Sequence, residues 1–253
     1  MATFVLVPGA WLGAWAWRRV TRALRAAGHE VFPVTLTALG DRAHLGSGAT
    51  DLSTHARDVV SLLEAEELTD VVLVGHSYAG AVVTVVAGQV PERIAELVYL
   101  DAQVPAPGVS LFDGDPDYRA YLEARAAEAG DPTRMAFLTD DELDQFYGEH
   151  GLGAEDLRWL RAHAVGLPMA THTEPVGPGP DLAAVPHTFI RCTGTPGPGL
   201  VEPGLPGWDY AELATGHWPM VTLPEALTKL LDERARRRER VGGGAPQPSA
   251  SPV

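Results

Sequence analysis

The chain has 253 residues, of which 45% are hydrophobic and 21% are charged, and its formal net charge is −14. These values are typical of a globular protein with a sizeable core, and the charge argues against binding to nucleic acid or to anionic membranes. A single cysteine, Cys192, excludes a scaffold built on intrachain disulfides. With no signal-like or membrane-length apolar run, we expect a cytoplasmic protein whose partner is a small-molecule substrate.

Short β-rich runs alternate with helical patterns along most of the chain. Continuous apolar strands that alternate with helices predict an α/β fold with a doubly wound, mostly parallel sheet covered on both faces. In chain order, the expected elements are strand 4–7, helix 18–27, strand 30–35, helix 52–66, strand 71–74, helix 79–89, strand 97–100, strand 188–192, strand 209–214 and a helix from 224 to about 238.

This rhythm is interrupted between Pro105 and Pro186. Three helical patterns (about 116–129, 140–149 and 154–165) occupy the interval without a convincing central strand. An insertion between two sheet strands is expected to lie over the carboxyl ends of the strands as a helical cap. We therefore divide the chain into an α/β core (1–104 and 186–240), a helical cap (105–185) and a flexible polar tail (241–253).

Residues 71–80 read V-V-L-V-G-H-S-Y-A-G, an apolar strand that runs into a helix with Ser77 at the turn. Such a turn strains the serine backbone and lifts its hydroxyl clear of the sheet, where a base can reach it. Ala79 stands where G-x-S-x-G has its second glycine. The alternative interpretation is a parallel strand followed by an ordinary glycine-rich turn.

A serine nucleophile needs a base, and His217 is the best placed of nine histidines. It follows the last predicted strand, in A-T-G-H-W-P-M, at the same sheet edge as Ser77. A serine in the middle of the chain and a histidine near its end is the order found in hydrolases whose serine lies on a strand-to-helix turn. An oxyanion hole needs two backbone N–H groups, for which we expect Tyr78 and Ala10. Trp11 is expected to face the substrate pocket, whereas packing accounts for the other two tryptophans of this loop.

Five stretches of the chain resemble one known group of proteins. The group is the α/β-hydrolases that include plant methyl esterases, hydroxynitrile lyases and their bacterial relatives. The resemblance implies Ser77 as nucleophile, His217 as base and a cap that encloses a mostly apolar pocket. The matching stretches are F-V-L-V-P-G-A-W-L-G-A-W-A-W, T-L-T-A-L-G-D-R-A-H-L, V-V-L-V-G-H-S-Y-A-G-A-V-V, L-V-Y-L-D-A-Q-V-P-A-P-G-V-S and G-H-W-P-M-V-T-L-P-E-A-L.

The chain departs from these relatives at three places. They commonly carry histidines where Pro8 and Leu12 stand, so the oxyanion loop is altered. Many carry the catalytic carboxylate in a C-T-E-D-like segment, which here reads C-T-G-T-P from Cys192. Hydroxynitrile lyases have a lysine beside the catalytic histidine, where this chain has Trp218, a residue that we expect at the pocket; that lyase activity is therefore disfavoured.

The source of the triad carboxylate stays open at this stage. Asp101 ends the strand in L-V-Y-L-D-A and could reach a histidine from the neighbouring strand, although an aspartate there also caps loop N–H groups. Glu202 is the first acid after the C-T-G-T-P segment. A Ser–His dyad without a carboxylate is the third possibility.

The leading hypothesis is a cofactor-free serine hydrolase acting on a small apolar carboxylic ester or lactone, with no metal. One alternative keeps the pocket but uses His217 as a general base for cyclisation, lactonisation or C–C cleavage in bacterial secondary metabolism. Another is a small-molecule binding protein without turnover. The sequence does not fix the substrate or the oligomeric state.

Overall fold

The computed structural model describes residues 1–114, 116–177, 179, 184–196 and 201–242. Its centre is a six-stranded sheet with the order β2-β1-β3-β4-β7-β8, in which every neighbouring pair is parallel. The strands are β1 (Thr3–Val7), β2 (Glu30–Pro33), β3 (Val71–His76), β4 (Ile94–Leu100), β7 (His187–Cys192) and β8 (Trp208–Leu213).

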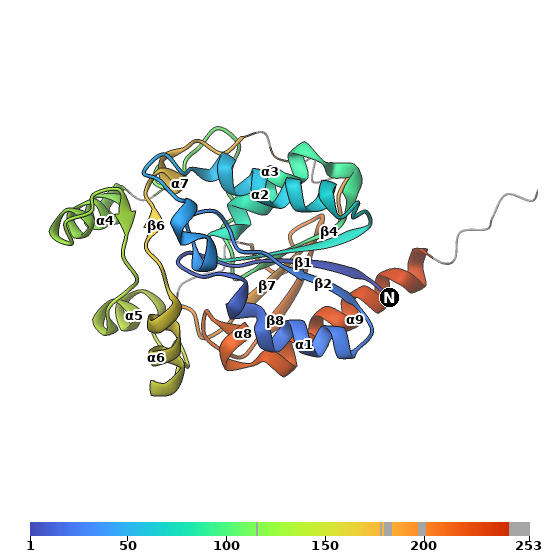
Figure 1. The fold of residues 1–253 in the computed structure, drawn as a ribbon. Coiled ribbons are helices and arrows are strands. Elements are labelled where there is room, and N and C mark those ends of the chain that lie inside the picture. Colours follow the sequence, from blue (N-terminus) through green and yellow to red (C-terminus); the bar gives the residue numbers. More distant parts are fainter. Residues whose placement is uncertain (115, 178, 180–183, 197–200, 243–253) are drawn as a thin grey trace, which may run out of the picture.

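Helices cover both faces of this sheet (Figure 1). On one face lie α2 (Leu52–Ala65) and α3 (Ala79–Gln89), and on the other lie α1 (Arg18–Ala26), α8 (Pro219–Thr222) and α9 (Pro224–Gly242). The two layers explain why β3 is buried along its whole length and has a continuous apolar run rather than an alternating pattern. The expected fold class, a doubly wound parallel sheet, is confirmed.

The segment between β4 and β7 stands beyond the carboxyl ends of the strands, at the left of Figure 1. Its three longer helices correspond to the three expected helical patterns, each ending within two residues of the expected end. A short antiparallel pair, β5 with β6, and the one-turn α7 were not expected. The elements are α4 (Pro116–Glu128), β5 (Arg134–Met135), α5 (Asp140–Tyr147), α6 (Ala154–His163), β6 (Leu167–Pro168) and α7 (Ala170–Thr173).

Smaller differences from the sequence expectation occur at the ends of elements. Three short 3-10 helices lie in connections, at Ala14–Trp17, Gly40–Leu45 and Pro91–Arg93. Helix α9 continues to Gly242, so the first two residues of the expected tail end a helix, and the rest of that tail (243–253) lies outside the described residues. Within the described part of the chain, no helix is long and apolar enough to cross a membrane.

Small residues let β3 and α3 approach closely on either side of Ser77. A Cβ at Gly75 would lie 2.7 Å from the Ala79 carbonyl oxygen and 2.8 Å from Val83 Cγ2. A Cβ at Gly80 would collide with the carbonyl group of Gln103. Glycine at position 75 therefore lets β3 and α3 pack at this spacing, and glycine at position 80 lets α3 approach the loop after β4.

We predict that Gly75→Ala lowers the free energy of unfolding by about 1–3 kcal/mol, because backbone atoms of α3 must move to admit the methyl group. Urea unfolding at neutral pH measures this loss. Gly177→Ala is the matched control, since a Cβ there meets nothing within 4 Å. Equal stability of the two variants would contradict the packing argument.

Candidate active site

Ser77 occupies the sharp turn between β3 and α3 with a left-handed backbone, φ 55°. Its N–H donates to the Leu100 carbonyl oxygen at 3.2 Å, and its own carbonyl accepts from the N–H groups of Gly80 and Gln103, both at 3.0 Å. Positive φ is unfavourable for an L-residue with a side chain, and these bonds from β4 and α3 hold the turn in place. The hydroxyl therefore projects from the carboxyl edge of the sheet.

Three side chains meet above this edge. His217 Nε2 lies 2.8 Å from Ser77 Oγ, and His217 Nδ1 lies 2.6 Å from Asp101 Oδ2. The histidine and aspartate side chains are only 7% and 9% exposed, so little water competes for these bonds. The structure thus brings together Ser77, His217 and Asp101, one of the two acids that the sequence left open.

The surroundings of Asp101 keep its carboxyl group ionised. Burial acts to raise its pKa, but hydrogen bonds from His217, Thr195 and the Cys192 N–H outweigh burial and lower the pKa below its usual value. Thr195 Oγ1 donates at 2.7 Å and the Cys192 N–H at 3.1 Å. An ionised carboxylate can only accept, so His217 Nδ1 donates to Asp101, and Nε2 of the neutral ring is then the acceptor for the serine hydroxyl.

Asp101 and Glu202, the two acids considered from sequence, lie in different settings. Asp101 follows β4 in a left-handed turn of its own, φ 44°, and its N–H donates to the Ile190 carbonyl oxygen at 2.7 Å. Glu202 is exposed in the connection between β7 and β8. The last residue of β7 and the segment after it, where many relatives have their acid, each supply one hydrogen-bond donor to Asp101.

His76, which the sequence did not suggest as a site residue, supports the loop that carries His217. Its Nε2–H donates to the His217 carbonyl oxygen at 2.7 Å, and the two rings lie 4.7 Å apart. Burial and the neighbouring His217 lower the pKa of His76 to about 3, so this ring stays neutral. Its place directly before Ser77, in a strand buried on both faces, is the signal that could have identified it.

The loop after β1 lies against the serine. A Cβ at Gly9 would come within 2.9 Å of Ser77 Cβ and 2.7 Å of His76 Nδ1, so only glycine allows this approach. Among the hydrogen bonds of the described residues, the backbone N–H groups of Ala10 and Tyr78 donate none. Pro8 and Leu12, where relatives have histidines, are buried.

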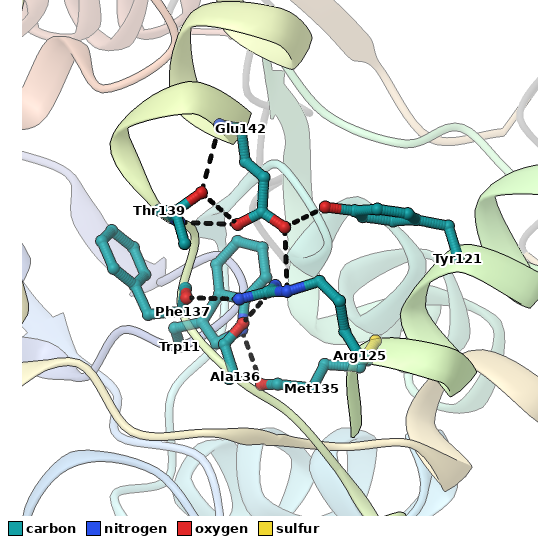
Figure 2. A network of polar contacts seen from close by, with 8 residues as sticks. All are labelled: Trp11, Tyr121, Arg125, Met135, Ala136, Phe137, Thr139 and Glu142. Carbon is teal, nitrogen blue, oxygen red and sulfur yellow. Dashed lines mark hydrogen bonds and ion pairs between the residues drawn. The ribbon is translucent and has the colours of Figure 1, made fainter. Parts of the chain in front are cut away.

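Trp11 joins this loop to the segment between β4 and β7. Its backbone is left-handed, φ 65°, and its indole Nε1–H donates to the Met135 carbonyl oxygen at 2.9 Å. Its ring also meets Phe137 edge to face, with centroids 5.6 Å apart. Figure 2 shows the indole at one end of a larger polar network.

A buried ion pair forms the rest of that network (Figure 2). Arg125 of α4 lies 2.8 Å from the carboxylate of Glu142 of α5, which is 5% exposed. Tyr121 donates to the same carboxylate, and Thr139 exchanges capping hydrogen bonds with Glu142. Arg125 also donates to the two carbonyl groups that follow Met135, at 3.5 and 3.3 Å. The two helices and the strand that accepts the Trp11 indole are therefore fixed together.

A cavity of about 450 Å³ opens beside Ser77. Trp11 lines it, as expected, but Trp218 is not among the described residues of its wall. Trp218 is 2% exposed and packs against the rings of His217 and Tyr147, at 5.0 and 4.8 Å. The indole of Trp218 therefore packs behind the imidazole of His217 and does not line the cavity. The lining residues are Ala10, Trp11, Ser77, Tyr78, Gln103, Leu111, Gly114, Tyr118, Met135, Phe146, Tyr147, Leu167 and His172.

Comparison with known proteins identifies the family. The sequence matches the alpha/beta hydrolase family over residues 4–230. The chain belongs to this family. It is 37% identical to the carbendazim hydrolyzing esterase of Nocardioides sp. over 242 residues, which cover 91% of this hydrolase and 98% of that protein. It is 28% identical to the pheophorbidase of Raphanus sativus over 201 residues, 74% of each protein.

Solved structures agree on the fold. A methylesterase from Arabidopsis is similar to the hydrolase with a TM-score of 0.72 and 23% identity, over 94% of this chain and 100% of that one. An extracellular alpha/beta-hydrolase from a Paenibacillus species has a TM-score of 0.75 and 23% identity, over 92% and 98% of the two chains. The expected resemblance to plant methyl esterases and their bacterial relatives is confirmed, and the enzyme class is ester hydrolase.

No group of three or more potential metal ligands occurs among the residues that the structure describes. Three side chains of ligand type in the second half of the chain take separate partners. His163 bonds to the Trp159 carbonyl group, His172 to Thr171, and Glu174 to Ser53.

We predict that Trp11→Phe lowers the free energy of unfolding of the hydrolase by about 1–3 kcal/mol, because the buried Met135 carbonyl group loses its donor. Urea unfolding measures the change. Trp15→Phe is the matched control, since Trp15 Nε1 is buried without a partner among the described residues. A loss in the control as large as in Trp11→Phe would contradict this role of the indole bond.

We further predict that His76 makes the hydrolase acid-sensitive. In the unfolded chain this histidine binds a proton below about pH 6.5, whereas in the folded chain its pKa of about 3 keeps it neutral. The unfolded state therefore gains protons as pH falls, which costs about 1.4 kcal/mol of stability between pH 7.5 and 5.5. His76→Gln should reduce the loss of stability over this interval by that amount in urea unfolding. An unchanged loss would argue against the neutral buried histidine.

Proposed function

We propose that this chain is a cofactor-free serine hydrolase that cleaves a small apolar carboxylic ester or lactone through an acyl-enzyme. The observation that carries the proposal is the continuous hydrogen-bonded connection from Ser77 Oγ through the His217 ring to the Asp101 carboxylate, at 2.8 and 2.6 Å. This is the arrangement that a hydroxyl needs to become a nucleophile at neutral pH.

The proposed reaction has two halves. Ser77 Oγ attacks the carbonyl carbon while His217 Nε2 takes the hydroxyl proton, and the imidazolium then gives that proton to the leaving alcohol. In the second half, His217 Nε2 takes a proton from water as the water oxygen attacks the acyl carbon; the bond between that carbon and Ser77 Oγ then breaks, the carboxylic acid leaves, and the imidazolium gives the proton from water to Ser77 Oγ. Asp101 holds the ring and stabilises its charge throughout.

The N–H groups of Ala10 and Tyr78 are the proposed oxyanion hole. Both flank the serine, and neither donates a hydrogen bond within the described residues, so both are open to an accepting oxygen. Two preorganised donors stabilise the negative charge that develops on the carbonyl oxygen. Gly9 allows the loop that carries Ala10 to come close enough to Ser77 for this role.

The cavity and the relatives support a small ester as substrate. A volume of about 450 Å³, lined by several aromatic and aliphatic side chains, is of the size that small-molecule sites have. Because a relative at 37% identity is named a carbendazim hydrolyzing esterase, carbendazim is a compound to test alongside simple esters. The bond between Ser77 and His217 favours hydrolysis over chemistry in which the histidine acts alone.

We predict that Ser77→Ala abolishes hydrolysis of a p-nitrophenyl ester panel and prevents labelling by a fluorophosphonate, because no nucleophile remains to form the acyl-enzyme. Mass spectrometry of the labelled wild type should place the adduct on Ser77. Substantial activity in Ser77→Ala that is lost in His217→Ala would instead support a reaction that uses only the base.

We predict that Asp101→Asn lowers kcat by roughly 10³- to 10⁴-fold with little change in KM, because an amide can donate to Nδ1 and stabilise the wrong tautomer of His217. Steady-state kinetics at neutral pH measures the effect. Glu202→Gln is the control and should retain wild-type kcat. A reversed result would assign the triad acid to Glu202, and full activity of both variants would indicate a Ser–His dyad.

A further inference from the structure

His172 is a wall residue of the same cavity whose position is closely fixed. It lies on α7, and its ring stacks on Tyr78 with centroids 5.1 Å apart and planes 16° apart. The ring of Phe112 lies 5.2 Å from it. Ser77, Tyr78 and His172 all line this cavity, so the stacked imidazole and the serine border the same space.

The hydrogen bonds of the neighbouring threonine determine where the proton on His172 lies. Thr171 Oγ1 is 2.7 Å from the Pro168 carbonyl oxygen, which can only accept, so the threonine hydroxyl donates its proton there. The same oxygen is 3.0 Å from His172 Nδ1 and must therefore accept from it. His172 carries its proton on Nδ1, and Nε2 has a free lone pair.

The hydroxyl group of Tyr78, the residue stacked on His172, does not donate to His172 Nε2. His55 Nε2–H donates to the Thr37 carbonyl oxygen at 2.8 Å, which leaves His55 Nδ1 as an acceptor. The Tyr78 hydroxyl donates to that nitrogen at 2.9 Å. Within the described residues, His172 Nε2 has no hydrogen-bond partner. This atom is not fully buried.

His172 Nε2 stays a hydrogen-bond acceptor at neutral and mildly acidic pH. Burial, with a smaller contribution from His55, lowers its pKa to about 3, so the ring does not become a cation at neutral or mildly acidic pH. A neutral imidazole nitrogen without a protein partner in a cavity wall can accept from a ligand donor, and a bound ligand that lacks such a donor leaves the nitrogen unpaired.

We propose that His172 Nε2 is a specificity-determining acceptor, and that the preferred esters carry an O–H or N–H donor in addition to the reacting ester group. This inference rests on the proposed function in that it uses the same cavity. It narrows the substrate class from small apolar esters to esters with an apolar body and one hydrogen-bond donor. A site that pairs a donor of its substrate discriminates strongly against analogues that lack it.

The test compares matched ligands that differ only in the donor. The methyl esters of 2-, 3- and 4-hydroxyphenylacetic acid and their fluoro analogues are titrated by calorimetry into Ser77→Ala protein, so binding is measured without turnover. We expect at least one hydroxy ester to bind about three- to tenfold more tightly than its fluoro partner. In Ser77→Ala/His172→Phe this preference should disappear, because phenylalanine keeps the stacked ring but has no acceptor.

Two further variants separate the acceptor from a structural effect. His172→Gln retains an accepting oxygen and should recover part of the preference. His163→Phe, which changes a histidine that lies against Trp15 outside this cavity, should leave the preference intact. Long-range 1H–15N correlation spectra of the wild type, with the His172 signal assigned from its loss in His172→Phe, should show a proton on Nδ1.

Several results would overturn the proposal. These are equal binding of each hydroxy and fluoro pair, absence of binding by all six esters, a preference that persists in the phenylalanine variant, or a proton found on Nε2. Failure of the proposed function gives a different result, namely fluorophosphonate labelling or ester hydrolysis that survives Ser77→Ala. The binding comparison and the tautomer measurement do not depend on that outcome.

Discussion

Two adjacent left-handed turns at the carboxyl edge of the sheet determine where the reactive groups stand. Ser77 directly follows β3 and Asp101 directly follows β4, and both have positive φ, which costs a residue with a side chain about 1–3 kcal/mol. The Ser77 N–H bonds to Leu100, the Asp101 N–H bonds to Ile190, and Gln103 bonds back to Ser77. Each turn is thus held by the neighbouring strand or the loop after it, and both side chains point toward the imidazole of His217.

The sequence predicts the parts of this arrangement that depend on local pattern. The apolar run before Ser77 and the loop position of His217 sufficed to suggest both residues, since strand order and chain direction place them at one edge. The choice between Asp101 and Glu202 could not be made in this way. It depends on the turn at Asp101 and on donors from Thr195 and Cys192, more than 90 residues away, which leave no trace in local sequence.

The same limit applies to the walls of the cavity. Trp218 was expected at the pocket because it adjoins His217, but consecutive residues at this turn point in different directions. His172 gave no signal because it lies on a single helical turn, and its stacking partner Tyr78 is distant in the chain. Trp11 meets Met135 across 124 residues. Through that bond, the loop proposed to hold the oxyanion is fixed to α4 and α5, so the segment between β4 and β7 supports this loop as well as lining part of the cavity.

The hydrogen bonds from Thr195 and Cys192 to Asp101 have an evolutionary consequence. Many relatives have their acid after the strand equivalent to β7, and β4 is its immediate neighbour at the roughly 4.8 Å spacing of paired strands. A carboxylate at the end of either strand can therefore accept the hydrogen bond from the same imidazole, while the serine and the histidine stay in place. A lineage could pass from one position to the other through an ancestor that had both acids. In the proposed mechanism the β7–β8 connection does not supply a carboxylate, which leaves its length and composition free to vary.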